Sequence, residues 1–378
     1  MTEESEPYIS FVVTARNDDH GGNQLRRMQI FVTGLLEQAK TYDLSAELIL
    51  VEWNPVSDRP PLRQVLSWPE GPCRVRIIEV PSEIHNRFRH SDRIPLFQMI
   101  AKNVGIRRAK GRFVLATNID LLFSEELASF LASKSLKPEF MYRIDRYDVS
   151  SDVPSDASIE ERLKYCRDNV IRVNRRDGTY PKHALRWIWL WKAHRGLALL
   201  YGWMLLSIPR WRHIKLKAVV ASGVRFLRKH VLRQYPRLHT NACGDFTLIA
   251  QEHWHAVRGY PELEMHSFHL DSVLCHIAYQ HGLREELLQD PMRIYHIEHS
   301  SGWTPEGDSK MKELLGIRGI PMLDFPQFES WAIRMQKEKR PMVFNSEDWG
   351  LASENLQETT IEQDHRERRT EIRTEEIR

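Results

Sequence analysis

Hydrophobic and polar positions follow a strand–helix order along the first 145 residues. Runs rich in β-branched and aromatic residues predict strands at 8–14, 47–53, 75–80 and 112–117. Between them, apolar residues spaced three and four apart predict helices over 23–40 and 95–109. Ser124 and the two glutamates after it predict a helix that extends to Ala132, because a serine caps free N–H groups and acids favour a helix N-terminus. The alternation predicts an α/β fold with a mostly parallel sheet flanked by helices.

The pattern breaks after the first half and then resumes. The α/β order continues with a strand-like run whose last residues are 247–250, helical patterns over 251–258 and 267–281, and a short strand at 294–297. We therefore expect four segments, which are a first α/β half (1–149), a helical insert (150–238), a second α/β half (239–345) and a charged, mobile tail (346–378).

The insert is basic and rich in tryptophan. Sixteen Lys/Arg and one acid lie between Arg172 and Arg237, a local balance of +15 in a chain of net charge +3. The thirteen apolar residues 196–208 are too few to cross about 30 Å of hydrocarbon. Residues 214–233 have an apolar and a basic helical face, which is typical of a helix lying on an anionic membrane surface. Packing in the core or in a homo-oligomer is the alternative for this segment.

Composition excludes several classes of protein. With 42% hydrophobic and 28% charged residues, the 378-residue chain is neither disordered nor a membrane bundle. Its four separated cysteines fit a reducing compartment, and no signal peptide is evident, so we expect a cytoplasmic, peripheral protein. The absence of P-loop, dinucleotide-binding and nucleophile-elbow motifs argues against those enzyme classes. Nucleic-acid binding ranks low, because the basic segment is mixed with long aliphatic runs.

Acidic residues follow two predicted strands. Asp120 comes after the strand at 112–117, and Glu52 lies near the end of the strand at 47–53. In mainly parallel sheets, ligands bind beyond the carboxyl ends of the strands. A carboxylate there is suited to a divalent cation that binds phosphates, although an aspartate capping the next helix would have the same sequence.

The order of short motifs resembles a GT-A-type, nucleotide-sugar-dependent glycosyltransferase, family 2-like with a galactosyltransferase-like C-terminal region. The matching pieces are VVTARND (12–18), LVEWNP (50–55), AKNVGIRRAKGRFVLATNID (101–120), ACGDFTLIAQEHW (242–254), RGYPELEMHSFHLD (258–271) and YHIEHSSGW (295–303). The resemblance implies that residues 1–149 bind the nucleotide-sugar and that residues 239–345 bind the acceptor and carry catalysis.

The resemblance also implies a set of donor-binding residues. They are Thr14, Arg16, Asn17, Glu52, Lys102, Asn103, Asn118 and Asp120. Thr14, Arg16 and Asn17 would face the nucleobase, and Glu52 would accept hydrogen bonds from the ribose or base. Ordinary polar residues at strand ends and on a solvated helix face are the simpler interpretation of these positions.

A divalent metal, Mn²⁺ or Mg²⁺, is implied as the cofactor. Its ligands would be Asp120, His299 and His296, since a histidine near the end of the fold completes the metal site in related transferases, and imidazole suits Mn²⁺-like ions. The family pattern after the fourth strand is Asp-x-Asp, whereas this chain has Asn118-Ile119-Asp120. The asparagine removes one negative charge from the expected site.

Asp271 is the candidate general base, because the family places this carboxylate at a helix start after a Gly-aromatic turn. It would take the proton of the acceptor hydroxyl, although an aspartate capping the helix is the alternative. Asp245 competes for the same role. Gly244, Phe246 and Trp254 are candidate acceptor contacts, with core packing as the alternative for the two aromatic residues.

We therefore predict a transferase of glycan biosynthesis that moves a sugar from a UDP-sugar donor to a lipid-linked or membrane-proximal glycan or glycolipid acceptor. The alternative, favoured by Asn118, is a non-catalytic peripheral membrane or scaffold protein with a degenerate GT-A fold.

Overall fold

The computed structural model describes residues 6–183, 234–300 and 307–361. The chain forms two compact units, a larger one of Met1–Thr179 and Leu238–Arg378 and a smaller one of Tyr180–Arg237. The apolar run 196–208 and the amphipathic segment 214–233 lie outside the described residues. Within the described ranges, no helix combines the length and the hydropathy that crossing a membrane requires.

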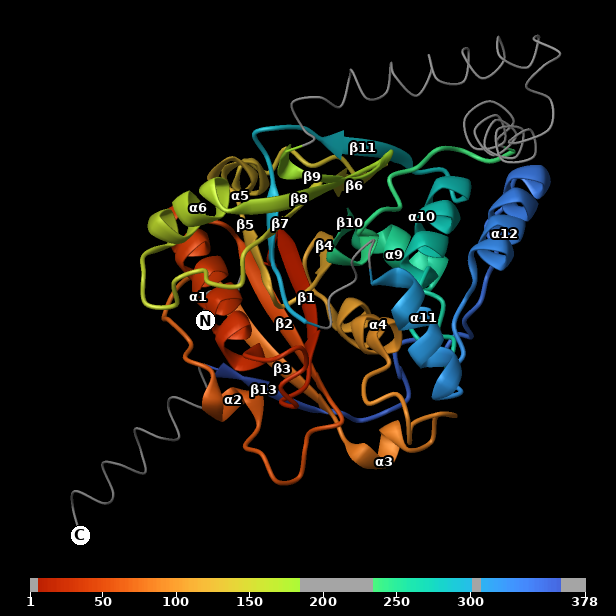
Figure 1. The fold of residues 1–378 in the computed structure, drawn as a ribbon, viewed down its shortest axis with the longest axis horizontal. Helices are drawn as coiled ribbons and strands as arrows, with labels where there is room; N and C mark the ends of the chain where they lie inside the picture. Colours follow the sequence, from red (N-terminus) through yellow and green to blue (C-terminus); the bar gives the residue numbers. More distant parts are fainter. Residues whose placement is uncertain (1–5, 184–233, 301–306, 362–378) are drawn as a thin grey trace, which may run out of the picture. The chain divides into compact units, whose positions relative to one another are not determined.

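An eight-stranded sheet forms the centre of the larger unit (Figure 1). Its strands, in spatial order, are β11 (Arg284–Leu288), β6 (Phe140–Ile144), β10 (Phe246–Ala250), β4 (Phe113–Thr117), β1 (Ile9–Ala15), β2 (Ala46–Trp53), β3 (Arg74–Val80) and β13 (Gln357–Thr360). The strands from β4 to β3 are parallel, as is the pair of β11 and β6. However, β10 is antiparallel to β4 and β6, and β13 is antiparallel to β3. The sheet is therefore mixed, which corrects the expectation of a mostly parallel sheet.

The direction of β10 has a consequence for the site. Its first residue, Phe246, pairs with Thr117, the last residue of β4. The short 3₁₀ helix η3 (Cys243–Asp245), which comes immediately before β10, therefore lies at the carboxyl end of β4. A parallel strand in this position would have placed these residues at the opposite edge of the sheet.

Helices cover both faces of the sheet (Figure 1). On one face are α1 (Gln24–Thr41), α5 (Glu125–Ala132) and α6 (Ile159–Asp168); on the other are α4 (Gln98–Arg108), α9 (Gln251–Val257), α10 (Leu270–Gln280), α11 (Asp308–Ile317) and α12 (Phe325–Glu338). Two short helices, α2 (Leu62–Val65) and α3 (Ser82–His85), follow β2 and β3. Strand alternation divides the core, because Phe11 and Val13 pack in the cluster that contains α1 whereas Val12 packs in the cluster that contains α4.

A five-stranded sheet lies beside the central one. Its order is β5 (Leu121–Phe123), β12 (Ile294–Ile297), β7 (Arg146–Val149), β8 (Val170–Arg175) and β9 (Gly178–Pro181). Within it, β12 runs antiparallel to β5 and parallel to β7. Residues 150–179, which we expected in the helical insert, form α6, β8 and the first part of β9.

Two local predictions have clear outcomes. The Ser124 cap is confirmed, because its hydroxyl accepts a hydrogen bond of 3.3 Å from the backbone N–H of Leu127. In contrast, part of the expected mobile tail is ordered as β13, and Ile361 is buried in the core next to it. The polar sequence of β13 suits an edge strand, which needs backbone pairing rather than apolar side chains to attach.

Candidate active site

A cavity of about 1410 Å³ opens where β1 and β4 end. The sequence-predicted residues that line it are Thr14, Arg16, Asn118, Asp120, Gly244, Asp245, Asp271, His296 and His299. All of them belong to the larger unit. The volume exceeds that of a typical small-molecule pocket, which is about 300–1,000 Å³. The cavity is therefore large for a single small ligand.

Asp120, His296 and His299 form a group that could hold a metal ion. Asp120 Oδ2 lies 3.3 Å from His299 Nε2 and 3.7 Å from His296 Nε2. A backbone hydrogen bond also joins the segment of Asp120 to β12, since the N–H of Ile297 donates to the Asp120 carbonyl at 3.0 Å. The other carboxylate oxygen, Asp120 Oδ1, is buried and has no hydrogen-bond partner among the described residues. An unpartnered carboxylate oxygen beside two imidazoles fits a divalent cation such as Mn²⁺.

The charges around this group act in opposite directions at its carboxylate and at its imidazole. Burial alone would raise the pKa of Asp120, but His296, His299 and Arg27 outweigh burial and hold that pKa well below its usual range. Burial and Arg146 would lower the pKa of His296, yet the neighbouring carboxylates raise it. The carboxylates that favour a proton on this imidazole would equally favour a metal cation in its place.

Both polar atoms of the Asn118 side chain form hydrogen bonds. Its side-chain oxygen accepts from Lys102 Nζ at 2.8 Å and from Gln98 Nε2 at 3.0 Å, and its amide nitrogen donates to Asp245 Oδ1. An aspartate at this position would repel Asp245, whereas the amide provides both an acceptor and a donor. The structure therefore gives a physical reason for the asparagine in the Asn-Ile-Asp motif, and it leaves Asp120 as the carboxylate of the metal group.

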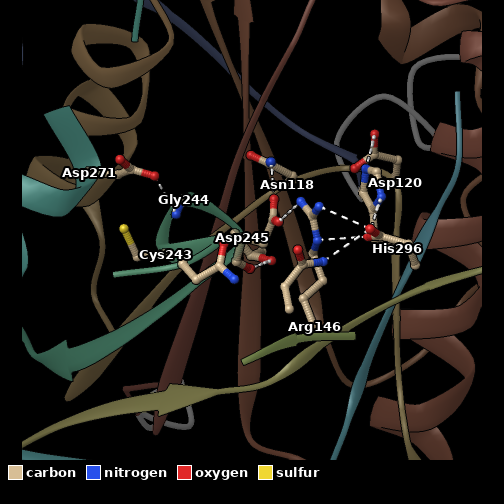
Figure 2. A network of polar contacts seen from close by, with 12 residues as sticks. Asn118, Asp120, Arg146, Cys243, Gly244, Asp245, Asp271 and His296 are labelled. Atoms are coloured by element: carbon tan, nitrogen blue, oxygen red, sulfur yellow. Dashed lines mark hydrogen bonds and ion pairs between the residues drawn. The ribbon is translucent and has the colours of Figure 1, made fainter. Parts of the chain in front are cut away.

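The two candidate bases differ in their partners. Asp245 Oδ2 forms an ion pair of 2.5 Å with Arg146, and Asp245 Oδ1 is bonded to Asn118. Asp271 accepts hydrogen bonds from two backbone groups, the N–H of Gly244 at 2.8 Å and the N–H of Ser272 at 2.7 Å. Asp271 is inside the first turn of α10, whose cap position is occupied by His269. Asp245 is thus held by side chains, while Asp271, at the cavity wall, is oriented mainly by backbone donors, with a longer bond of 3.4 Å from the Ser272 hydroxyl (Figure 2).

Two predicted donor contacts lie away from the cavity lining. Asn17 donates a 2.9 Å hydrogen bond from its amide to the Pro60 carbonyl. Both carboxylate oxygens of Glu52 accept from the backbone N–H of Leu62, at 2.9 and 3.1 Å. Burial raises the pKa of Glu52 to about 7, although the bond from Leu62 opposes the shift. Both side chains therefore brace the segment between β2 and α2.

Other predicted residues are buried in the core. Lys102 is fully buried, and burial lowers its pKa to about 8 despite nearby Asp245 and Asp271. Asn103 exchanges two hydrogen bonds of 2.8 Å with the backbone of Tyr260. Phe246 and Trp254 have no exposed surface, and neither lines the cavity. Of the predicted acceptor contacts, the structure places only Gly244 at the cavity.

Arg146 and Asp148 were missed by the sequence analysis. They stand two apart on β7, so strand alternation directs both toward the same side. Arg146 joins Asp245 to Asp148, and it lies between Asp245 and the group around Asp120 and His296 (Figure 2). The signal in the sequence is a charged residue at alternate positions of a strand, in RYDV, which is unusual for a buried strand.

Comparisons with known proteins give a distant structural likeness. No family model matches the chain, and no curated protein matches it. Among solved structures, the catalytic domain of Drosophila β1,4-galactosyltransferase 7 in complex with xylobiose is similar at a TM-score of 0.31 and 9% identity, over 80% of this chain and 79% of that one. Likeness at this level does not establish a shared fold, so the site is interpreted from its own residues.

Proposed function

We propose that the protein is a glycosyltransferase that moves a sugar from a nucleotide-sugar donor, a UDP-sugar, to a glycan acceptor, assisted by a divalent metal. The observation that carries the proposal is one cavity with a metal-type group, Asp120, His296 and His299, and a separate carboxylate, Asp271, on its wall. The arrangement agrees with the motif order that resembles GT-A transferases. It provides the two things that sugar transfer requires, which are stabilisation of the leaving phosphate and removal of a proton.

The metal group would bind the donor through its phosphates. A bound Mn²⁺ or Mg²⁺ would neutralise negative charge on the departing nucleoside diphosphate. Asp120 would hold the ion through its carboxylate, and the two histidines would complete the set. Thr14 and Arg16, at the end of β1, would contact the nucleoside, since both line the cavity. Arg16 is already oriented by a 2.7 Å hydrogen bond to the Asn54 carbonyl.

Asp271 would act as the general base in an inverting transfer. The acceptor oxygen bonds to the anomeric carbon, the bond from that carbon to the phosphate oxygen breaks, and the hydroxyl proton moves to the Asp271 carboxylate. Asp245 is a weaker candidate, because the Arg146 guanidinium pairs with one of its oxygens and opposes a proton there, whereas the donors to Asp271 are neutral. We assign Asp245 a positioning role, in which it fixes the loop that carries Gly244.

The acceptor is proposed to be lipid-linked or close to a membrane. This part of the proposal rests on the sequence of the basic, tryptophan-rich segment 182–233, which would hold the enzyme at the cytoplasmic surface of an anionic membrane.

Donor turnover is the test of the proposed function. A panel of UDP- and GDP-sugars is incubated with the full chain, with and without Mn²⁺, and the released nucleoside diphosphate is measured. We expect release from one donor class that depends on Mn²⁺ and is lost in Asp120→Ala. Nucleotide binding without release from any donor, with or without glycolipid acceptors, would instead support the non-catalytic scaffold.

A further inference from the structure

Two groups of potential metal ligands share His296. One contains Asp120 and His299, and the other contains Asp148 and Glu298. His296 Nε2 faces the first group, 3.7 Å from Asp120 Oδ2, while its Nδ1 faces the second, 3.2 Å from Asp148 Oδ1. The imidazole therefore lies between two carboxylates that approach its two ring nitrogens.

The second group is already occupied by cations of the chain itself. Asp148 Oδ1 lies 2.8 Å from Arg146 Nε, and Asp148 Oδ2 lies 2.6 Å from Arg172 Nε and 3.0 Å from Asn174 Nδ2. Glu298 pairs with the same Arg172. Because two guanidinium groups already neutralise these carboxylates, a divalent ion there would meet strong repulsion. Asp120 Oδ1 and Asp148 Oδ1 both lack a hydrogen-bond partner among the described residues, but of the two only Asp148 Oδ1 has a guanidinium within ion-pair distance.

The contact between Asp148 and His296 determines what each ring nitrogen can do. The two atoms are at ion-pair distance and do not meet hydrogen-bond geometry, but the negative charge of Asp148 at 3.2 Å still favours a proton on Nδ1. That tautomer leaves the lone pair on Nε2 free for a metal. Asp148 has no exposed surface and is fixed by three side chains, so it can hold the ring in a single orientation. His296 Nε2 then points toward Asp120 and the cavity.

We propose that Asp148 is a positioning residue for the metal site, which orients His296 and fixes its tautomer so that Nε2 binds the ion held by Asp120 and His299. The inference deepens the proposed function and rests on its metal group. Arg146 extends the arrangement, because the same guanidinium contacts Asp148 and Asp245 and so ties the metal side of the cavity to the loop before β10.

Metal binding without any nucleotide tests the inference. Free Mn²⁺ is titrated into the full chain and followed by electron paramagnetic resonance. We expect Asp148→Asn to raise the Kd for Mn²⁺ by about 10- to 100-fold, the usual effect of losing such a partner, and Asp120→Ala to abolish binding. With Co²⁺ as the probe, Asp148→Asn should also change the visible absorption spectrum, because the imidazole ligand is no longer held in place.

Glu47→Gln is the matched control. Glu47 is equally buried and is paired with an arginine, Arg76 Nη1, at 2.8 Å, but it lies outside the cavity lining. The Glu47→Gln variant should lose stability, as Asp148→Asn does, but keep the wild-type Kd for Mn²⁺. A Kd for Asp148→Asn within threefold of wild type, or equal weakening in both variants, would overturn the inference.

A measurement on the wild-type chain covers the case in which Asp148→Asn does not fold. In protein with ¹⁵N-labelled histidine, Zn²⁺ should shift Nε2 of His296 while Nδ1 stays protonated, with the signal assigned by its loss in His296→Gln. Metal binding through Nδ1 would contradict the proposal, as would a wild-type chain that binds neither Mn²⁺ nor Zn²⁺. Asp148-dependent Mn²⁺ binding without turnover of any donor would refute the proposed function and leave this inference standing.

Discussion

The backbone N–H of Gly244 donates a 2.8 Å hydrogen bond to Asp271 Oδ2, and this contact joins the loop before β10 to the first turn of α10. A Cβ atom at position 244 would lie 3.0 Å from the same oxygen. The close approach of backbone to carboxylate therefore depends on the glycine. Lys102 Nζ also donates to the Gly244 carbonyl at 2.6 Å, so both backbone polar groups of Gly244 are fixed by side-chain partners.

We expect Gly244→Ala to lower kcat by about tenfold, because an added methyl group displaces the Asp271 carboxylate by a few tenths of an ångström and proton transfer is sensitive to such shifts. Affinity for Mn²⁺ should not change, since the metal group is built from other segments. Steady-state kinetics with the donor identified in the panel, together with an Mn²⁺ titration, measure both quantities. An unchanged kcat would show that the position of the Asp271 carboxylate does not depend on the glycine at 244.

Asp271→Asn is expected to lower transfer by roughly 10²-fold or more, because the amide keeps the size of the carboxylate but cannot take a proton. Donor binding should persist. Glu252→Gln is the matched control, since Glu252 is also an acid in the first turn of a helix, α9, and is exposed. If Asp245→Asn abolishes transfer while Asp271→Asn remains active, the roles of the two acids must be exchanged.

Stability should depend on the ionisation of Glu52. Its pKa rises from 4.5 to about 7 in the folded chain, so between these values the folded state retains a proton that the unfolded state has released. Stability then falls as pH rises through this window, by up to about 3 kcal/mol from this residue. The Glu52→Gln variant lacks this dependence. In urea unfolding from pH 4.5 to 8, the free energy of unfolding of Glu52→Gln should increase relative to wild type as pH rises. If the two free energies change with pH in parallel, the pKa of Glu52 is not raised.

The regular elements were the most predictable part of the fold. β1, α1 and β4 agree with their expected ranges within a few residues, because their apolar patterns reflect burial on one or both sides. The direction of β10 was not predictable, since its FTLIA sequence packs equally well in either orientation beside β4. The polar strand β13 has no apolar pattern at all, and backbone pairing with β3 determines its place.

The candidate site likewise has a part that the sequence predicted and a part that it did not. Asp120, Asp245, Asp271 and the two histidines meet at one cavity, as their place near the ends of predicted strands and helices suggested. Glu52 and Asn17 occupy similar sequence positions, yet their side chains turn toward nearby backbone donors and acceptors. Such local competition for hydrogen bonds cannot be read from position along the chain. Arg146 and Asp148 were missed because the contacts that tie them to the cavity, with Asp245 and His296, span more than 90 residues of sequence.

The attachment of β13 should be sensitive to one carboxylate. Arg76 is buried and binds Glu47 at 2.8 Å and Glu358 of β13 at 2.6 Å. We expect Glu358→Gln to lower the free energy of unfolding by about 2 kcal/mol, because a buried guanidinium loses one of its two charged partners. The comparison variant is Glu354→Gln, whose partner Arg87 is exposed, and it should change stability by less than about 0.5 kcal/mol. Equal effects in urea unfolding would contradict this account.

The basic segment should bind anionic membranes through its charge. Each lysine or arginine near such a surface contributes on the order of 1 kcal/mol, so the sixteen between Arg172 and Arg237 would suffice even if only half of them reach it. Co-sedimentation of the full chain with vesicles should therefore rise with the content of anionic lipid. It should fall only in part at high salt, because the tryptophan and aliphatic side chains add burial that salt does not screen.

A charge-reversal pair makes this last prediction specific to the segment. Changing Lys215, Lys217, Arg228 and Lys229 to glutamate should weaken vesicle binding strongly, leaving the part that comes from apolar burial. The control changes four exposed basic residues elsewhere, Lys134, Lys137, Lys337 and Arg340, to glutamate and so alters the net charge equally. If both variants lose binding to the same extent, net charge alone explains the attraction. A wild-type chain that stays in the supernatant at low salt would exclude membrane docking and leave packing within a dimer as the role of the segment.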